Sequence, residues 1–274
     1  MRIKGSVTLV TGASSGIGEA TALAFARRGA RLALCARRLD RIQAVAEACR
    51  RAGAQEVTIR RVDVRRREQA RSFVAGAVRD FGRVDVLVNN AGLGWRGRLQ
   101  EMPAAEALAM VETNLCGLLW TTQAALPHML ARRSGVIVNI ASVVGFRANP
   151  YSALYSATKH AVVGLSHALR GELSGSGVKV SVVYPAATET EFFDHLEHAA
   201  VLGPRWTAEK VAHLVVRAVR RPRRDVIVFP MRAGHLAEPV VGGVLDHALG
   251  ELMRRAEPGL RGPGELPPEV DEPE

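Results

Sequence analysis

The chain has 274 residues, of which 47% are apolar and 23% are charged, and its formal net charge at pH 7 is +10. This length and composition fit one globular domain, or at most two small ones. No stretch approaches the roughly 18 uncharged apolar residues that a membrane-spanning helix needs, and the N-terminus does not have the layout of a signal peptide. Cys35, Cys49 and Cys116 are too few and too scattered for a disulfide framework or a thiolate metal site. We therefore expect a cytoplasmic protein with reduced thiols and no bound metal.

The excess of positive charge comes from arginine, because 33 of the 37 cationic residues are arginine and only four are lysine. Many arginines stand in pairs near the ends of expected helices, where a cation meets the negative end of the helix dipole. Clusters at residues 65–67 and 220–224 leave a nucleic-acid surface as an alternative, but no aromatic residues interleave with them. A compositional bias toward arginine explains the charge better, and we expect no nucleic-acid partner.

Apolar strand-like runs alternate with longer helical patterns along the chain. The expected strands cover residues 6–11, 31–36, 56–62, 84–88, 136–140, 179–184 and 225–229, and the clearest helices cover 16–28, 40–52, 104–133 and 152–174. Asp40 is the expected N-cap of the second helix. The strands are rich in Val, Leu and Ile, as in a sheet that is buried on both faces. The pattern predicts an α/β fold with a Rossmann-type, doubly wound parallel sheet of about seven strands and helices on both faces.

The chain divides into a body and two C-terminal segments. Residues 1–232 form the expected single domain. Residues 233–256 carry apolar side chains at helical spacing and predict a helical extension that packs on its own domain or on a second subunit. A membrane-surface helix is the weaker alternative, because the apolar run is short and contains Asp246 and Glu251. Residues 257–274 hold five prolines and six acidic residues, so we expect a disordered acidic tail.

The first expected strand ends in the sequence TGASSGIG, residues 11–18, where a helix begins. Gly12 permits a sharp turn, Gly16 lets a pyrophosphate approach bare backbone, and Gly18 lets the helix pack closely on the strand. The helix N-terminus offers unpaired N–H groups and positive partial charge to phosphates. A glycine-rich turn in this strand–helix context predicts a dinucleotide site. Its expected contacts are Gly12, Ser14, Ser15, Gly16, Ile17 and Gly18.

Further motifs follow in order: NNAG at residues 89–92, Ser142 after the fifth expected strand, and YSATK at residues 155–159. With the glycine spacing, they strongly resemble the short-chain dehydrogenase/reductase family, in its compact one-domain branch. The resemblance covers residues 6 to about 230. It implies hydride transfer between a nicotinamide cofactor and a small-molecule carbonyl compound or secondary alcohol. It also implies a homodimer or homotetramer assembled through the helices at 104–133 and 152–174.

The end of the second expected strand bears on the choice of nucleotide. An acidic residue there would accept a hydrogen bond from the ribose 2′-hydroxyl of NAD, but residues 34–38 read LCARR. Because a guanidinium binds a 2′-phosphate through charge-assisted hydrogen bonds, we predict NADP(H) in preference to NAD(H). Arg37 is the expected main contact and Arg38 an assisting one, although solvated surface arginines remain an alternative. The resemblance places Asp63 and Val64 at the adenine, and Asn90, Ala91 and Gly92 along the ribose.

The loop after the sixth expected strand departs from the family pattern. The family commonly has Pro-Gly-x-x-x-Thr there, whereas this chain has Ala186 after Pro185. Alanine adopts positive φ less readily than glycine, which leaves the path of the loop open. Because Pro185 and Thr190 are in place, the resemblance implies nicotinamide contacts through the Thr188 backbone and the Thr190 side chain.

Tyr155 and Lys159 are four residues apart and therefore lie on one face of one helix. Free tyrosine, with a pKa of about 10, is a poor acid–base group at neutral pH. Because a nearby ammonium favours the phenolate, we expect Lys159 to lower the pKa of Tyr155, the general acid/base. The resemblance adds that Lys159 also binds the nicotinamide ribose, that Ser142 orients the substrate carbonyl, and that Asn114 holds a water in a proton relay.

Apolar and aromatic side chains suggest an apolar substrate pocket: Trp95, Val144, Phe146, Phe192, Phe193, Leu196, Leu202 and Trp206. His195 and His198 could begin a metal site, but no further ligand pattern accompanies them. The sequence thus predicts an NADP(H)-dependent oxidoreductase acting on an apolar substrate. The alternative is a non-catalytic NADP(H)-sensing protein of the same fold, which would be expected to have lost Tyr155 or Lys159.

Overall fold

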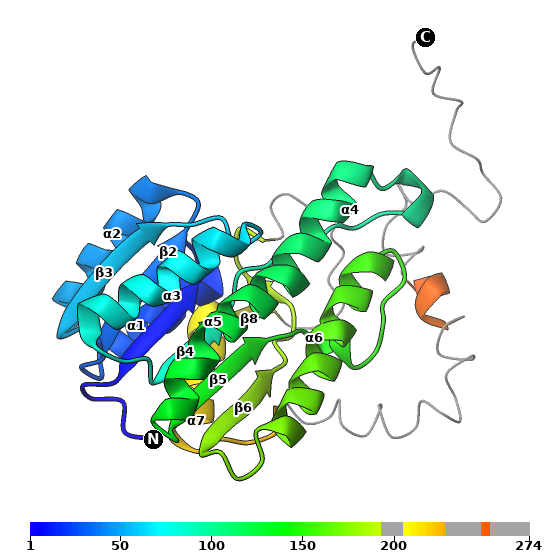
Figure 1. Ribbon diagram of the computed structural model, residues 1–274. Coiled ribbons are helices and arrows are strands. Elements are labelled where there is room, and N and C mark those ends of the chain that lie inside the picture. The colour runs from blue at the N-terminus through cyan, green and yellow to red at the C-terminus, as the bar shows by residue number, and fades with distance from the viewer. Residues whose placement is uncertain (193–204, 228–247, 253–274) are drawn as a thin grey trace.

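The computed structural model describes residues 1–192, 205–227 and 248–252. Its centre is one parallel sheet (Figure 1), made of β1 (Val7–Thr11), β2 (Arg31–Ala36), β3 (Glu56–Arg61), β4 (Val86–Asn89), β5 (Gly135–Ile140), β6 (Val178–Val183) and β9 (Asp225–Val226). The strands lie in the order β3-β2-β1-β4-β5-β6-β9, and all their pairings are parallel. The chain runs outward from β1 to β3 and then crosses back to β4, so the strand order reverses between β1 and β4. Ligands bind at such a switch point, outside the carboxyl ends of the strands.

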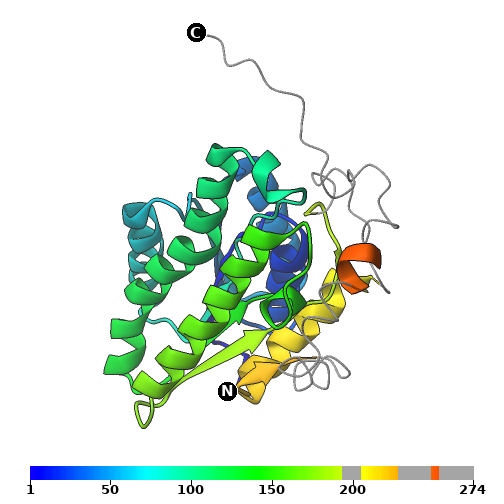
Figure 2. The ribbon, with the colours of Figure 1, turned by 90° about the vertical axis from the view of Figure 1, so that its right-hand side faces the viewer.

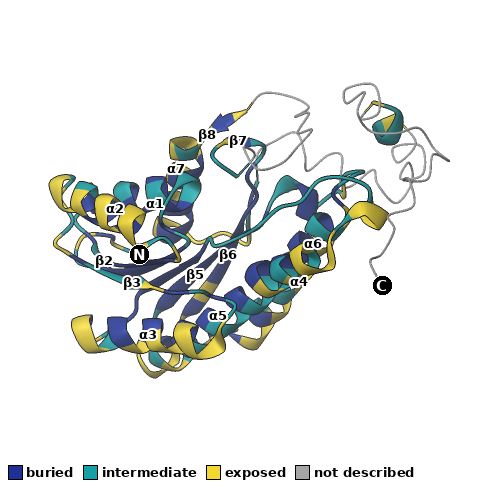
Figure 3. Cartoon of the chain, turned by 90° about the horizontal axis from the view of Figure 1, so that it is seen from above, coloured by how far each residue is buried: buried dark blue, intermediate teal, exposed yellow. Residues whose placement is uncertain are grey.

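Helices cover both faces of the sheet, as Figure 3 shows from above. One layer contains α1 (Gly16–Ala26), α2 (Leu39–Arg51) and α7 (Ala208–Arg220), and the other contains α3 (Arg67–Phe81), α4 (Ala104–Val111), α5 (Gly117–Ala131) and α6 (Ala153–Glu172). The short strands β7 (Thr188–Glu189) and β8 (Trp206–Thr207) form a separate parallel pair. This arrangement confirms the predicted doubly wound fold.

A hydrophobic core lies on each side of the sheet. Phe25 of α1 and Leu34 of β2 belong to one core, and Phe73 of α3 and Ile137 of β5 belong to the other. Every residue of β1, β4 and β5 is buried. Strands covered on both faces gain from apolar side chains at consecutive positions, which explains their Val, Leu and Ile content.

The structure corrects several expected boundaries. Helix α2 begins at Leu39 with Arg38 at the N-cap position, so Asp40 lies in the first turn and the prediction that it caps the helix was wrong. The helix expected at 104–133 is α4 and α5 joined by a π-helix, η2 (Glu112–Cys116). Residues 248–252 are helical, whereas the rest of the expected extension and tail, 233–247 and 253–274, lies outside the described residues. Among the described helices, none is long and apolar enough to cross a membrane.

A buried polar network ties the middle of the sheet to the second helical layer. The Asn89 Nδ2 donates to Asn139 Oδ1 and to Thr122 Oγ1, each at 2.9 Å. The Thr121 hydroxyl donates to Asn89 Oδ1 at 2.7 Å, and the Asn139 Nδ2 donates to the Ser166 hydroxyl at 2.9 Å. Satisfied buried networks of this kind hold one arrangement of the chain. This one fixes β4, β5, α5 and α6 directly beneath the loops that carry the candidate site.

Candidate active site

A cavity of about 1040 Å³ runs along the carboxyl edge of the sheet, across the switch point. Eighteen residues named as contacts from the sequence line it: Gly12, Ser14, Ser15, Gly16, Ile17, Arg37, Arg38, Asp63, Val64, Asn90, Ala91, Gly92, Ser142, Tyr155, Lys159, Pro185, Thr188 and Thr190. Gly18 and Asn114 are not among its lining residues. One end of the cavity therefore holds the glycine-rich turn, and the other holds Tyr155 and Lys159.

The glycine-rich turn needs residues without a side chain at three positions. Gly12 and Gly16 have φ of +64° and +58°, which glycine adopts at no steric cost. A Cβ on Gly12 would lie 2.8 Å from the Ala91 Cα, and a Cβ on Gly18 would lie 2.2 Å from the Gly12 carbonyl oxygen. The turn is thus a cradle of bare backbone, and Gly18 acts behind it by letting α1 approach β1.

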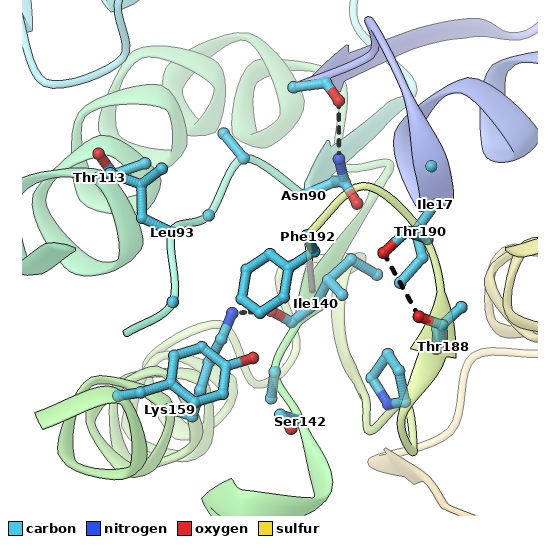
Figure 4. Close-up of a pocket in the computed structure, with 18 of the residues that line it drawn as sticks. Ile17, Asn90, Leu93, Thr113, Ile140, Ser142, Lys159, Thr188, Thr190 and Phe192 are labelled. Carbon is cyan, nitrogen blue, oxygen red and sulfur yellow. Dashed lines mark hydrogen bonds between the residues drawn. The ribbon is translucent and has the colours of Figure 1, made fainter. Parts of the chain in front are cut away.

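Asn90 joins the ends of β1 and β4 at the switch point. Its Nδ2 donates to the carbonyl oxygens of Thr11 at 3.0 Å and Gly12 at 3.1 Å. The Thr11 hydroxyl in turn accepts from the backbone N–H groups of Asn90 and Ala91. Thr11 was not named as a site residue from the sequence, although its place at the start of the TGASSGIG motif was the available signal. These contacts position Gly12, Asn90 and Ala91, which line the cavity; Figure 4 shows the Asn90 side chain there.

The N-terminus of α1 faces the cavity. Its N-cap residue, Ser15, makes no side-chain capping hydrogen bond to the helix. Instead, the hydroxyls of Ser15 and Ser14 accept from the Arg38 guanidinium at 2.9 and 3.3 Å. The positive end of the helix and this guanidinium thus lie together, and both favour a bound phosphate. With the bare backbone of the turn, the residues present fit the pyrophosphate of a dinucleotide.

Six charged side chains lie at the end of the cavity where the sequence predicts the adenosine. Arg37 is exposed. Arg38 donates to Glu191 Oε2 at 3.1 Å, and Arg41 contacts the other carboxylate oxygen of Glu191. Asp63 accepts from Arg65 through both carboxylate oxygens, and these hydrogen bonds lower the pKa of Asp63. Glu191 was not predicted, because its partners are separated from it by some 150 residues of sequence.

Ser142, Tyr155 and Lys159 come together at the other end, as the motifs predicted. The Tyr155 phenol is hydrogen-bonded to the Ser142 hydroxyl. The Lys159 Nζ, on a side chain buried in the wall, donates to the Ile140 carbonyl oxygen at 3.1 Å (Figure 4) and lies 5.6 Å from the centre of the Tyr155 ring. Helix α6 supplies the tyrosine and lysine one turn apart, and the chain after β5 supplies the serine.

The expected lowering of the Tyr155 pKa by Lys159 was wrong for this geometry. Desolvation raises the pKa of Tyr155 to about 12, and the hydrogen bond with Ser142 opposes this rise only in part. Burial also lowers the pKa of Lys159 to about 8. Both shifts have the same origin, because a poorly solvated environment disfavours the charged form of each group. Around neutral pH, Tyr155 is therefore a phenol and Lys159 is mostly an ammonium.

Asn114 lies in the π-helix, behind the wall of the cavity. Its Oδ1 accepts from the Leu93 N–H at 2.7 Å, and its Nδ2 donates to the Leu93 carbonyl at 2.9 Å and to the Thr158 hydroxyl at 3.0 Å. The side chain thus clamps the loop after β4 to helix α6. A Cβ on Gly92 would lie 3.3 Å from Asn114 Oδ1 and 3.6 Å from Lys159 Nζ, so Asn114 positions the backbone beside the lysine.

The loop after β6 accommodates Ala186 without left-handed backbone. Outside glycine, the only positive φ values in the described part of the chain belong to Arg133 and Tyr151. The Thr188 hydroxyl donates to the Ala186 carbonyl at 2.8 Å, and the Thr190 hydroxyl donates to the Thr188 carbonyl at 3.4 Å. A Cβ on Gly16 would lie 3.0 Å from the Thr190 Cγ2. This loop therefore crosses the cavity and reaches the glycine-rich turn, called the phosphate turn below.

The expected apolar pocket is present in part. Trp95, Val144, Phe192 and Trp206 line the cavity, together with Leu249, which was not predicted. Phe146 instead stacks on Tyr184 with ring centres 4.0 Å apart. Phe193, His195, Leu196, His198 and Leu202 lie outside the described residues. Within the described ranges, no group of His, Cys, Asp and Glu residues could hold a metal ion.

A second tyrosine, Tyr184, also lines the cavity, but its hydroxyl is engaged by a neighbouring carboxylate. Its ring is fully buried, and its hydroxyl donates to Asp225 Oδ1 at 2.9 Å. Burial and the neighbouring carboxylate both raise the pKa of this phenol. Tyr155 is therefore the cavity tyrosine that lies beside both a serine and a lysine.

A doubly wound sheet with a phosphate cradle at its switch point and a serine, tyrosine and lysine across the same cavity defines an oxidoreductase that uses a nicotinamide dinucleotide. The short chain dehydrogenase family model matches residues 6–200. An uncharacterized oxidoreductase of Staphylococcus saprophyticus is 39% identical over 71% of this chain and 78% of its own length. The chain belongs to the short-chain dehydrogenase/reductase family and is a nicotinamide-dependent dehydrogenase or reductase.

Two solved structures are similar over most of the fold. A short chain dehydrogenase/reductase from Burkholderia phymatum, in complex with NAD, has a TM-score of 0.82 and 29% identity over 89% of this chain and 96% of its own. An alcohol dehydrogenase from Thermococcus sibiricus, complexed with 5-hydroxy-NADP, has a TM-score of 0.75 and 32% identity over 82% of this chain and 96% of its own. The similar structures therefore include complexes with both kinds of nicotinamide cofactor.

Proposed function

We propose that the protein transfers a hydride between NADP(H) and the carbonyl or secondary alcohol group of an apolar small molecule. The observation that carries this proposal is the meeting of Ser142, Tyr155 and Lys159 in the same cavity as the glycine-rich turn. Bound there, the cofactor supplies the hydride in reduction and accepts it in oxidation. The protein supplies the binding of both molecules, their orientation and the movement of one proton.

In reduction, the Ser142 hydroxyl donates a hydrogen bond to the substrate carbonyl oxygen and orients it. The Tyr155 phenol then gives its proton to that oxygen as negative charge develops. The raised pKa of Tyr155, about 12, keeps the proton on the phenol at neutral pH. In oxidation the step runs in reverse: the phenolate form of Tyr155 takes the proton of the alcohol hydroxyl and becomes the phenol. Lys159 binds the nicotinamide ribose beside Gly92, and Asn114 holds the loop there and contributes to the water relay.

The preference for NADP(H) over NAD(H) is supported by the end of β2. Arg37 and Arg38 both line the cavity, and neither position offers the carboxylate that would favour NAD. We propose Arg37 as the main contact for the 2′-phosphate and Arg38 as the assisting one. Fluorescence titrations with NADPH and NADH test the preference, and tighter binding of NADH would reverse it.

The choice of an apolar substrate rests on the lining of the cavity near Tyr155. Trp95, Val144 and Phe192 contribute apolar surface there, and Leu249 adds more from the helical segment at 248–252. Apolar and aromatic walls with a few directed polar groups are typical of small-molecule sites. A panel of ketones, aldehydes and secondary alcohols of increasing apolar size, assayed by the absorbance of NADPH, tests this choice.

Tyr155→Phe tests the assignment of the acid/base. The variant loses the proton but keeps the ring, so turnover is expected to fall by a factor of about 10² to 10⁴ while NADPH binding stays nearly unchanged. Tyr151→Phe is the matched control, because Tyr151 is not among the residues that line the cavity, and it is expected to keep its activity. A fully active Tyr155→Phe enzyme would refute the assignment.

A non-catalytic NADP(H)-sensing protein is the second candidate. It would bind NADPH and release it unchanged with every carbonyl compound of the panel. Both groups that such a protein could lose, the Tyr155 phenol and the Lys159 ammonium, are present and lie close together, which favours the enzyme.

Residues 1–232 are proposed as the single catalytic domain of this enzyme. The helical extension at 233–256 and the acidic tail at 257–274 are proposed as segments that follow it.

A further inference from the structure

A carboxylate from the far side of the cavity lies among the arginines at the adenosine end. Glu191 follows β7 and lines the cavity. Its Oε2 accepts from the Arg38 Nη1 at 3.1 Å, and its Oε1 accepts from Arg41. The other terminal nitrogen of Arg38 donates to Ser14 and Ser15. Arg38 therefore bridges the phosphate turn and a carboxylate that comes from about 150 residues further along the chain.

The placement of Glu191 is set by its two neighbours in sequence. The Thr190 side chain packs on the phosphate turn, where a Cβ on Gly16 would lie 3.0 Å from it. The Phe192 ring lies 5.6 Å from the ring centre of Tyr155, and a Cβ on Gly94 would lie 2.4 Å from its edge. Figure 4 shows the side chains of Thr190 and Phe192 in the cavity. Glu191 lies between these two residues in sequence, and its carboxylate contacts Arg38 and Arg41.

The ion pair is accessible to an incoming ligand. The side chains of Arg38 and Glu191 are 41% and 40% exposed, so the pair lies at the mouth of the cavity rather than in the protein interior. Hydrogen bonds from Arg41 and Arg38 lower the pKa of Glu191, and the carboxylate is ionised at neutral pH. An ionised carboxylate and a phosphate use a guanidinium in the same way, through charge-assisted hydrogen bonds to planar N–H groups.

We infer that Glu191 is an internal competitor for the 2′-phosphate of NADP(H) and so determines how strongly the enzyme discriminates between the two cofactors. This inference rests on the proposed function. A 2′-phosphate that reaches Arg38 competes with the Glu191 carboxylate, since two anions on one guanidinium repel each other. A ribose 2′-hydroxyl carries no charge and has no such conflict. Glu191 therefore weakens the binding of the phosphorylated cofactor more than that of the other.

Two nucleotides that differ only in this phosphate test the inference without any hydride transfer. Binding of adenosine 2′,5′-bisphosphate and of adenosine 5′-monophosphate is measured by calorimetry for the full chain and for Glu191→Gln. The substitution is expected to lower the Kd of the bisphosphate by about three- to fivefold, the range of an exposed ion pair. The Kd of the monophosphate, which has only the 5′-phosphate, is expected to change less, so the ratio of the two Kd values shifts in favour of the bisphosphate. Glu189→Gln is the matched control, because Glu189 is an exposed acid two residues earlier, and it should change neither value.

The same measurement in an Arg38→Gln variant shows whether Glu191 acts on bisphosphate binding through Arg38. In Arg38→Gln, the added Glu191→Gln substitution is expected to give no gain in bisphosphate affinity, because the contested guanidinium is absent. The inference is overturned if Glu191→Gln leaves the ratio of the two Kd values unchanged or lowers the preference for the bisphosphate. Failure of the proposed function reads out separately, as a lack of NADPH oxidation with every carbonyl compound, and neither result determines the other.

Discussion

At the level of single residues, the buried ammonium of Lys159 lowers the stability of the folded protein. The side chain is 5% exposed, and its Nζ donates to a backbone carbonyl, that of Ile140. A charge that is withdrawn from water with so little compensation destabilises the folded state. Burial lowers the pKa of Lys159 to about 8 for the same reason, because it disfavours the charged form. Catalytic sites keep such groups because the chemistry needs them there.

Lys159→Met should therefore stabilise the protein while abolishing its activity. The pKa of Lys159 is about 8 in the folded state and about 10.4 in an unfolded chain. Below pH 8 both states hold the proton and the cost is fully present. Between these two values the folded state has released the proton and the unfolded state has not, so the stability of the parent protein rises with pH. The variant is expected to gain about 1–3 kcal/mol at pH 7.

Urea unfolding of both proteins over a series of pH values measures this difference. The advantage of the variant should shrink as pH rises through the interval above 8, since the parent then loses its buried charge. Lys179→Met is the control, because Lys179 is exposed on β6 and its removal should give no pH-dependent gap. A gap for Lys159→Met that stays constant with pH would show that packing, and not charge, sets the stability.

At the level of secondary-structure elements, the features that depend on local sequence patterns could be predicted. The strands were recognisable because a sheet buried on both faces needs consecutive apolar residues, and the TGASSGIG turn because its glycines have steric reasons. The π-helix at Glu112–Cys116 was not predicted, because its clamp by Asn114 on Leu93 and Thr158 depends on tertiary packing. The contact of Glu191 with Arg38 and the raised pKa of Tyr155 depend on long-range proximity and burial, which no local pattern encodes.

Gly18→Ala tests the packing of α1 against the end of β1. The new Cβ would lie 2.2 Å from the Gly12 carbonyl oxygen and 2.5 Å from the Asn90 Nδ2. Because the first of these atoms belongs to the backbone, the helix must move. The free energy of unfolding of the variant is therefore expected to be about 1–3 kcal/mol lower than that of the parent. The same shift opens the phosphate cradle, so the affinity for adenosine 2′,5′-bisphosphate should fall as well. Chemical unfolding and calorimetry measure the two effects.

Gly164→Ala in α6 is the matched control for this prediction. It also adds one methyl group to a helix, but apart from its chain neighbours and the backbone of its own helix, no atom lies within 4 Å of the new Cβ. Alanine lowers the entropy of the unfolded chain relative to glycine, so this variant is expected to be more stable by about 0.5–1 kcal/mol. Equal effects of the two substitutions would contradict a role for close packing at Gly18.

At the scale of the whole molecule, the two helical layers differ in the apolar surface that they leave outside. In the second layer α4 and α5 follow one another end to end through the π-helix, and α6 runs beside them (Figure 2). Leu108 of α4 is 65% exposed and Leu130 of α5 is 40% exposed. The first layer exposes Leu39 at the start of α2, at 41%. Exposed leucines on neighbouring helices favour association, and they lie on the helices through which the sequence predicts a homodimer or homotetramer.

Leu108→Glu is therefore expected to weaken self-association, because a buried charge in a symmetric interface occurs once in each subunit and opposes its own copy. Size-exclusion chromatography with light scattering measures the mass, which for the parent should be two or four times the 29.5 kDa of one chain. Leu39→Glu introduces the same charge on the opposite layer and should leave the mass unchanged. A parent protein that runs at the mass of a single chain would contradict the prediction, and so would an unchanged mass for Leu108→Glu. A loss of mass in both variants would show that the effect is not specific to α4.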